Sequence, residues 1–536
     1  MSVLPVPNMD SQWADHSGLY AKGLKQSNPG IPDPTVFTAF VQEIDRGIAG
    51  ETSLPIDPPL FEPAQGVVLG GTAKQNGPQG AFAAQPVGKL SPQYPAAVAP
   101  TVGDDEYAVE LAELYWASLL RDVPFTRFSM AHPLIKAAVD NLNDPLLLPN
   151  YRGPVDPVTK KVTPALLFRG GLPANKRKKV DGGGTEPVAY FQDEVAGPYM
   201  SQLCLWPTGL GAQQINQKMQ TLMPGQDFMT NPNEWFRVQT GLPPARQLML
   251  DPVRRYMRDG RALAAFTHID ELYQAYLTAY LVLKTWQVPA NPGSPYTAYQ
   301  NQQPFGTFGG PDIAATLGAI AKAAINAVWY QKWAVHLRHR PEAGGGLVHL
   351  WRTGASNLPQ AAAAFSTSFG DILASVLDVS SQKYSRPNAS SDHDRIFLLS
   401  QAFPEGSPTH AAYPTGHGAV AGACITALKF FFDCNQRVAS FVEPVVPADD
   451  GLSLQPYDGA DADDMTINGE LHKLAHNISF GHGIHAGIHW RSDTDESILF
   501  GEQVAIAFLH DQVKFYSEKC SVPIIKTDGT TETFAN

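Results

Sequence analysis

The chain has little cysteine, and this scarcity excludes two kinds of site. Its 536 residues include only four cysteines, which are too few and too scattered for a disulfide framework. None belongs to a CxxC or CxxCH motif, so structural zinc and covalently attached haem have no support. We expect buried thiols, with a single bridge as the alternative. The four are Cys204, Cys424, Cys434 and Cys520.

Positive charge and long apolar runs are also lacking. The chain has 39 Lys and Arg residues against 51 Asp and Glu residues, and a net charge of −12 argues against a nucleic-acid or anionic-membrane partner. The most apolar segment, residues 313–333, is interrupted by Lys322, Asn326 and Gln331, so we expect no membrane span. The first residues lack the basic and apolar regions of a secretory signal. We therefore predict a soluble protein, cytoplasmic by default.

Proline and glycine divide the chain into two parts. Residues 1–104 are rich in both, and we expect them to form an N-terminal extension that takes part in assembly contacts. A helix is predicted up to about Arg121, residues 149–245 are again irregular, and from about residue 260 apolar residues recur at helical spacing with little strand-like alternation. Residues 105–536 are therefore predicted to form one all-α catalytic domain of helical bundles with long Pro/Gly-rich loops. The predicted helices span residues 105–121, 262–286, 312–337, 359–378, 416–432, 466–481 and 495–518.

The first polar stretch in this helical part reads KWAVHLRHRPE from Lys332 to Glu342. A lysine point charge and the Arg340 fork, eight residues apart, can clamp one oxyanion from two sides. Pro341 is predicted to mark the end of the preceding helix. Alone the pattern is weak, because basic residues near a helix C-terminus more often complement the helix dipole.

The second stretch reads PEGSPTHAAYPTGHG and precedes an apolar helix. Thr415 is placed as an N-cap, and Gly416 allows close approach to the backbone. A helix N-terminus with free N–H groups, a hydroxyl and the His417 imidazole can bind an anion. The competing interpretation is a capped helix with an exposed histidine.

The third stretch reads NISFGHGIHAGIHWRSD from Asn477 to Asp493. Its closely spaced histidines are possible metal ligands, although the glutamate of an HExxH site is missing. His489 could equally be a core histidine. Asp493, four residues later, could orient its ring.

Taken in order, the motifs Lys-x7-Arg-Pro, Pro-Thr-Gly-His and Ala-Gly-Ile-His-x3-Asp closely resemble the signature of the vanadium haloperoxidase and type 2 acid phosphatase superfamily. The eight-residue Lys-to-Arg step and residues 405–417 are similar to those of red-algal and cyanobacterial bromoperoxidases. The resemblance covers most of residues 105–520.

The resemblance implies a role for each matching position. His489 would be the axial ligand to vanadium, with Lys332 and Arg340 neutralising vanadate oxygens. The Gly416 backbone and the Thr415 hydroxyl would donate further hydrogen bonds, and His417 would be the acid–base group. His410 matches a second histidine of the algal bromoperoxidases, whereas Trp329 resembles a tryptophan of the fungal chloroperoxidases. The two residues point to different halides, and bromide is the favoured substrate.

Two positions depart from the pattern of the family. Thr415 stands where the family usually has serine, which keeps the donor and adds a methyl group. Gly483 stands where a second arginine is expected, six residues before the ligand histidine. His482, His485 and Arg491 are alternative sources of the lost donor, and a one-residue local shift could restore one.

The predicted function is vanadate-dependent oxidation of bromide, with chloride and iodide as further candidates, by hydrogen peroxide. The product would halogenate small organic nucleophiles. The resemblance also implies a homo-oligomer built on dimers, up to a dodecamer. The main rival is a phosphatase of the same superfamily with a histidine nucleophile; a non-catalytic assembly or anion-storage protein is the second. Calcium at residues 458–464 is conceivable but unsupported, because the spacing is not that of an EF-hand.

Overall fold

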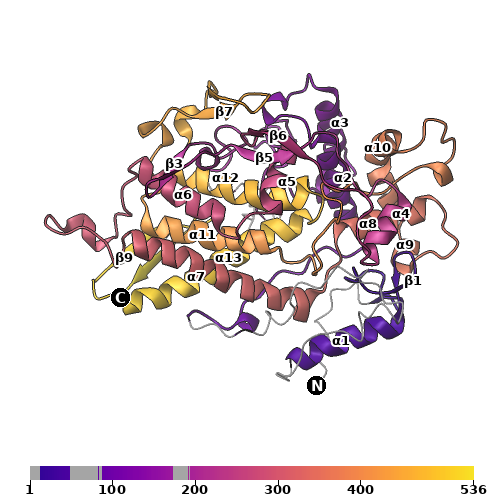
Figure 1. Ribbon diagram of the computed structural model, residues 1–536, viewed down its shortest axis with the longest axis horizontal. Coiled ribbons are helices and arrows are strands. Elements are labelled where there is room, and N and C mark those ends of the chain that lie inside the picture. Colours follow the sequence, from indigo (N-terminus) through magenta and orange to yellow (C-terminus); the bar gives the residue numbers. More distant parts are fainter. Residues whose placement is uncertain (1–11, 49–82, 84–86, 173–190, 192) are drawn as a thin grey trace.

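The computed structural model describes residues 12–48, 83, 87–172, 191 and 193–536, and these fold mainly into helices. Figure 1 shows the long helices α7, α11 and α13 running alongside one another through the body of the molecule. α12 packs on the same group, and α2 packs against α10. The predicted all-α class is confirmed. The helices are α1 (Pro34–Ile48), α2 (Asp105–Leu120), α3 (Pro133–Leu142), α4 (Pro232–Gln239), α5 (Gly260–His268), α6 (Gln274–Thr285), α7 (Gly310–Tyr330), α8 (Pro341–Arg352), α9 (Gln360–Ala363), α10 (Thr367–Tyr384), α11 (Gly416–Phe431), α12 (Ile467–Phe480) and α13 (Arg491–Gln512).

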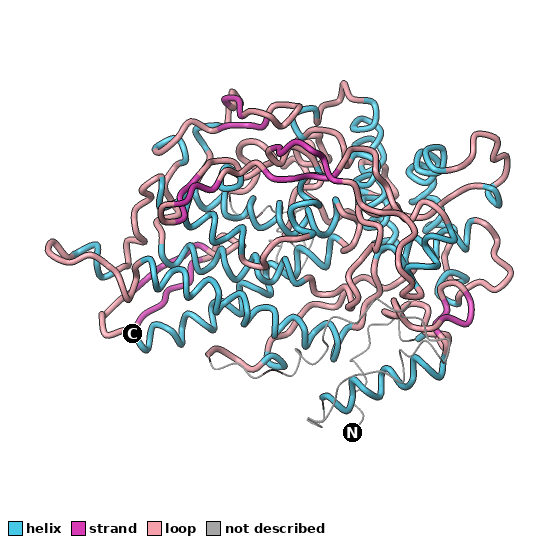
Figure 2. Tube along the Cα trace, viewed as in Figure 1, coloured by secondary structure: helices cyan, strands magenta, loops and turns pink. Residues whose placement is uncertain are grey.

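The strands are short and pair only into two-stranded antiparallel sheets in the described part of the chain. Figure 2 shows them as small magenta segments among long pink loops, around the helical body. The pairs are β1 (Gln26–Asn28) with β2 (Ile31–Pro32), β3 (Thr208–Leu210) with β4 (Gln213–Ile215), β5 (Met219–Leu222) with β6 (Leu250–Arg255), β7 (Val445–Pro447) with β8 (Leu454–Pro456), and β9 (Ser521–Ile525) with β10 (Thr531–Ala535).

Two glycines bring the backbones of α11 and α13 into direct contact. A Cβ atom at Gly422 would collide with the carbonyl of Ile498, and one at Gly501 would collide with the carbonyl of Ala419. Side chains at these positions would force the helices apart in a core that is otherwise close-packed. The contact fixes the middle of the two helices against each other, and predicted site residues lie at or next to their N-terminal ends.

The predicted helix boundaries need three corrections. The segment 262–286 is two helices, α5 and α6, because the chain turns at residues 269–273. The segment 359–378 is likewise divided into α9 and α10. Pro341 does not end a helix: it is the first residue of α8, where a missing N–H costs nothing.

Part of the predicted N-terminal extension packs close to the Lys332 segment. Tyr20, Phe37 and Phe40 form a buried apolar cluster with Trp333 and four other core residues. Lys22 is buried, pairs with Glu342 at 2.6 Å and donates to the carbonyls of Glu405 and Ser407. Much of residues 1–104 lies outside the described residues, so the proposed domain division stays a prediction.

The cysteines and the most apolar helix lie inside the body of the fold. All four cysteines are free and buried, as expected. The 27-residue stretch from Gly310 to His336 is long and apolar enough to cross a membrane, but 56% of its most apolar window is buried within the protein. The helices α11 and α13 pack against it. It is therefore a core helix, and the described residues contain no clear membrane span.

Candidate active site

Lys332 lies on a π turn, η11 (Gln331–His336), that continues α7. Its side chain is fully buried, and its ammonium donates to the carbonyls of Ala411 (2.9 Å) and Ala412 (2.8 Å). Burial and the nearby Arg340 lower the pKa of Lys332 well below its ordinary value. Such a lysine is stabilised as a cation by any anion that binds beside it.

Arg340 connects three of the predicted site segments. It precedes α8, and its side chain is 1% exposed. Its guanidinium donates to the carbonyls of His410 (2.9 Å) and Ile488 (3.0 Å), and Nη1 lies 2.8 Å from Nε2 of His489. Nη2 lies 2.9 Å from Nδ1 of His410. Burial lowers the pKa of Arg340 to about 10.

His489 has one ring nitrogen held and the other facing the cations. Nδ1 lies 3.0 Å from Oδ2 of Asp493, which also accepts from the Trp490 amide. The carboxylate thereby favours a proton on Nδ1 and leaves the lone pair of Nε2 directed toward Arg340. Burial, with Arg340 and Lys332 close by, lowers the pKa of His489 well below its ordinary value. A neutral imidazole whose unprotonated Nε2 now lies beside Arg340 is a suitable ligand for a metal oxyanion, if Arg340 turns its Nη1 to the oxyanion instead.

Thr415, Gly416 and His417 form the N-terminus of α11, as predicted. Thr415 is the N-cap, but its Oγ1 is buried and has no hydrogen-bond partner among the described residues. The Cβ position of Gly416 is 3.7 Å from Trp329, whose ring contacts His410 at 4.7 Å between centroids. The N-terminus of α11 therefore reaches the aromatic group beside Arg340, with one buried hydroxyl unsatisfied.

His417 is held by a residue that sequence reasoning missed. Its Nε2 lies 3.0 Å from Oδ1 of Asp270, a buried carboxylate in the turn between α5 and α6. The sequence signal for this turn was concealed by apolar residues that continue the helical pattern across residues 262–286. Asp270 leaves Nδ1 of His417 as the ring nitrogen available for proton exchange.

Of the three alternatives for the missing arginine, only His482 lies beside the other predicted residues. Its ring stacks on His417 at 4.0 Å between centroids and is 5.6 Å from the ring of His489. His485 points elsewhere, toward Tyr199 (2.8 Å), and Arg491 pairs with Glu113. Nδ1 of His482 is buried and has no partner in the described part of the chain.

A second π turn, η15 (Gly481–His485), explains how His482 reaches this place. The amides of Ala486 and Ile488 bond to carbonyls five residues earlier, at Gly481 and Gly483. A π turn holds one residue more than an α turn, and such turns are frequent at functional sites. Gly483 itself has no room for a long side chain, since its Cβ position lies 3.0 Å from Thr494 and 3.3 Å from His489.

The acidic segment 458–464 shows no cation site. Asp461 accepts from the Gly197 amide (2.7 Å) and the Tyr457 hydroxyl (2.7 Å), so its carboxylate is already engaged. Within the described residues, no group of three or more His, Cys, Asp or Glu side chains is arranged to hold a metal ion. The cluster of Lys332, Arg340 and the neighbouring histidines is a different kind of site, because its donors are cationic or neutral and suit an anion.

The fold and this cluster of buried cations and histidines define a helical protein whose interior could hold a small oxyanion beside a histidine. No protein-family model matches the chain. A vanadium-dependent bromoperoxidase of Corallina officinalis is 32% identical over 98% of this chain and 92% of its own length, and that of Corallina pilulifera is equally similar. One from Ascophyllum nodosum is 31% identical over 94% and 84%. The chain belongs to the vanadium-dependent bromoperoxidase family.

A solved structure supports the same assignment. The homohexameric second vanadate-dependent bromoperoxidase of Ascophyllum nodosum aligns with 99% of this chain and 87% of its own, with a TM-score of 0.80 and 25% identity. The similarity therefore extends through the whole fold and is not confined to the three motifs.

Proposed function

We propose that the chain is a vanadate-dependent haloperoxidase that oxidises bromide with hydrogen peroxide, and that the pocket around Lys332, Arg340 and His489 holds the vanadate. The observation that carries this proposal is that the positive charges of Lys332 and Arg340 have no negative partner among the described residues. Both cations are almost wholly buried, yet no carboxylate oxygen of the described residues lies within 4.0 Å of either. A buried charge without a partner is strongly disfavoured, so a bound anion is the expected counter-ion.

The unsatisfied polar atoms of the pocket fit the same group. Oγ1 of Thr415 and Nδ1 of His482 are buried without partners, and the α11 N-terminus supplies the Gly416 amide. Nε2 of His489 would be the ligand atom, with Asp493 fixing its ring. We assign His482 the donor role of the family's second arginine, because the π turn places it beside His417 and His489.

Bound vanadate supplies a Lewis acid that activates hydrogen peroxide for attack by halide. The protein's contribution is position and charge. Lys332 and Arg340 keep positive charge next to the reacting oxygens in a buried site, where such charge acts more strongly than in water. His417, held at Nε2 by Asp270, exchanges a proton at Nδ1. The products would halogenate small organic nucleophiles.

The test compares two activities of one preparation. The protein is dialysed with and without orthovanadate, then assayed for peroxide-dependent bromination of a phenol dye and for hydrolysis of a phosphate monoester. We expect bromination that requires orthovanadate, and a loss of about 10²–10⁴-fold in His417→Ala. Phosphatase activity without bromination would instead support the rival function. Orthovanadate binding without either activity, unchanged in both His417→Ala and Lys332→Met, would favour the anion-storage alternative.

The role of His482 is tested by binding rather than turnover. We expect His482→Ala to weaken orthovanadate binding, measured by equilibrium dialysis, by about tenfold, the value of one hydrogen bond to a charged group. His485→Gln is the matched control, because it lies on the same π turn and faces Tyr199. Equal affinity in His482→Ala and the control would exclude His482 as a donor.

We also propose that the chain assembles as a homo-oligomer, as the solved relative does, with residues 1–104 contributing contacts between subunits. The relative is a homohexamer, whereas the sequence resemblance implies a dimer-based assembly up to a dodecamer. Light scattering on the full chain, whose mass is 58.0 kDa, distinguishes these states. A monomer would contradict the proposal.

A further inference from the structure

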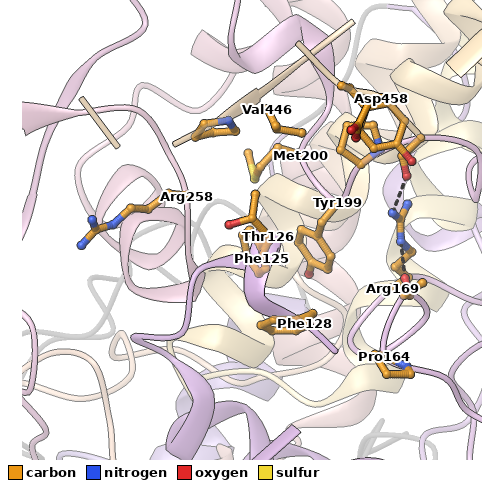
Figure 3. Close-up of a pocket in the computed structure, with 15 residues that line it drawn as sticks. Phe125, Thr126, Phe128, Pro164, Arg169, Tyr199, Met200, Arg258, Val446 and Asp458 are labelled. Atoms are coloured by element: carbon orange, nitrogen blue, oxygen red, sulfur yellow. Dashed lines mark hydrogen bonds between the residues drawn. The ribbon is translucent and has the colours of Figure 1, made fainter. Parts of the chain in front are cut away.

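A second cavity, of about 390 Å³, lies among loops that carry none of the residues assigned to vanadate. Figure 3 shows its walls, which come from residues 125–128, 164–169, 197–200, 446–447 and 457–458. Its size is within the range of pockets that enclose small organic ligands. Nothing in the proposed reaction uses it.

One wall of the cavity is a rigid aromatic surface. The rings of Phe125 and Tyr199 stack at 3.9 Å between centroids with an interplanar angle of 17°, and Phe128 packs edge-on against Phe125 at 5.4 Å. The Tyr199 hydroxyl is already engaged in hydrogen bonds with the Phe168 carbonyl (2.9 Å) and with His485 (2.8 Å). The two rings cover one face of each other and the Arg169 guanidinium lies 5.7 Å from the Tyr199 centroid, so the pair offers a flat apolar ring its edges and the remaining Phe125 face.

Arg169 places a buried positive charge in the same cavity. Its side chain is 6% exposed and donates to the carbonyls of Ala165 (2.8 Å), Gly197 (2.9 Å) and Glu194 (3.3 Å). A guanidinium has five N–H donors, so two remain. No carboxylate oxygen among the described residues lies within 4.0 Å of it. Arg169 thus shares with Arg340 the feature that points to an anion.

The other charged groups of the cavity restrict where an anion can lie. Arg258 pairs with Asp259 at 3.1 Å, and Figure 3 shows it pointing away from the aromatic rings. Asp458 is exposed and also lines the cavity. A ligand with several negative charges would be repelled by Asp458, so a single anionic group directed at Arg169 is favoured.

We propose that this cavity binds a small aromatic carboxylate, with its ring against Phe125 and Tyr199 and its carboxylate on Arg169. A bidentate pair between a guanidinium and a carboxylate uses the two remaining donors and neutralises the buried charge. Edge and face contacts with the aromatic wall bury the ring. The site is independent of vanadate, so its failure and the failure of the proposed function are separate results.

The test uses 2-naphthoate as the probe and 2-naphthylmethanol as its uncharged analogue. Binding to the full-length, vanadate-loaded protein is measured by calorimetry. We expect the naphthoate to bind at least tenfold more tightly than the alcohol, because a charge-assisted pair is lost with the carboxylate. Val446→Trp should fill the cavity and abolish binding, Arg169→Met should weaken binding at least tenfold, and Arg258→Met should change it by less than twofold.

Each comparison also has a contrary result. Equal affinity for the naphthoate and the alcohol would overturn the role of Arg169, even if Arg169→Met fails to fold. Undiminished binding in Val446→Trp would place the ligand elsewhere, and no binding at millimolar concentration would refute the site. Orthovanadate affinity is measured alongside, and we expect it to be unchanged in Val446→Trp.

Discussion

Arg338 and Arg340 are separated by one residue and are equally buried, at 1% exposure each, yet their surroundings differ in one respect. Arg338 contacts two carboxylates, Asp493 at 2.7 Å and Glu110 at 3.1 Å. Arg340 contacts only carbonyls and histidine rings. Burial alone would lower both pKa values, but Asp493 and Glu110 hold the pKa of Arg338 above its ordinary value, whereas that of Arg340 falls to about 10.

Other buried cations of the described residues also fall into those that contact a carboxylate and those that do not. Arg121 pairs with Asp227 at 2.6 Å, and Arg491 pairs with Glu113 on the buried helix α2. These neutralised cations join segments that are far apart in the chain. Lys332, Arg340 and Arg169 belong to the contrasting group, since they are buried without a contacting carboxylate; Lys429 is buried likewise and contacts His472 and the Ile525 carbonyl. Buried cations of the first kind stabilise the fold, and those of the second kind are available to an anion.

The largest expected effect is a difference in stability between Arg338→Met and Arg340→Met. Removing Arg338 leaves Glu110 and Asp493 charged, buried and unpaired, so we expect the free energy of unfolding to fall by about 3–5 kcal/mol. Removing Arg340 frees two carbonyls and two histidine ring nitrogens but also removes an uncompensated charge, so we expect a change of no more than about 1 kcal/mol. Urea denaturation of the vanadate-free proteins measures both.

Orthovanadate binding should be affected in the opposite order: more by Arg340→Met than by Arg338→Met. Arg340→Met is expected to fold and to lose orthovanadate binding. Arg338→Met, where enough of it folds, should retain the Arg340 and Lys332 donors. If Arg340→Met were the less stable variant, the distinction between stabilising and anion-binding cations would be wrong.

The sequence predicted the helical class and the site segments because both depend on local patterns. Helical spacing of apolar residues locates α7, α11, α12 and α13, and the motif order identifies Lys332, Arg340 and His489. The structure places these residues together, although their individual roles remain proposals. Pro341 was misread because a proline can follow one helix or begin the next, and the spacing alone does not distinguish the two.

The partners of these residues depend on the tertiary fold and could not be predicted. Asp270 and Glu110 lie more than 140 residues before the groups they contact, and neither belongs to a motif. The π turn at Gly481–His485 was also hidden, because the segment reads GHGIH and the predicted helix ended at residue 481. A π turn stands where a one-residue local shift was suggested, and of His482, His485 and Arg491 only His482 lies beside His417 and His489.

His476 is another buried group that contacts carboxylates, and unlike the arginines its charge changes within the accessible pH range. It lies 2.8 Å from Glu194 and 3.3 Å from Asp495, and although burial would lower its pKa, these carboxylates raise it to about 9. Because the folded-state pKa is higher than the unfolded value, the ion pairs stabilise the protein fully below about pH 6.5. This stabilisation, about 3 kcal/mol, is lost as the pH rises through about 9.

Denaturation of the wild type and of His476→Gln between pH 6 and 10 measures this loss. We expect the difference in stability between the two proteins to shrink as the pH rises. A constant difference over that range would show that the imidazole is not charged in the folded state, and would remove His476 from the neutralised group.

An added oxyanion should neutralise Lys332 and Arg340, the buried cations that lack a contacting carboxylate. Orthovanadate at about 100 times its Kd is expected to raise the free energy of unfolding by about 2.7 kcal/mol, since it binds only the folded chain. The increase should disappear in Lys332→Met and in Arg340→Met, and thermal denaturation with and without orthovanadate measures it. Stabilisation that persists in both variants would place the anion at another site.

The smallest effect is expected where the pair is exposed. Lys136 and Asp140 form an ion pair one turn apart on α3, with side chains 57% and 53% exposed. Water screens both charges and the long lysine side chain loses entropy, so Lys136→Met should change the free energy of unfolding by no more than about 0.5 kcal/mol. A loss of several kcal/mol here, measured by the same urea denaturation as for Arg338→Met, would mean that pairing alone stabilises the fold. A negligible loss would show that the large effect of Arg338→Met comes from the burial of Glu110 and Asp493, because an unpaired charge is costly only where water cannot reach it.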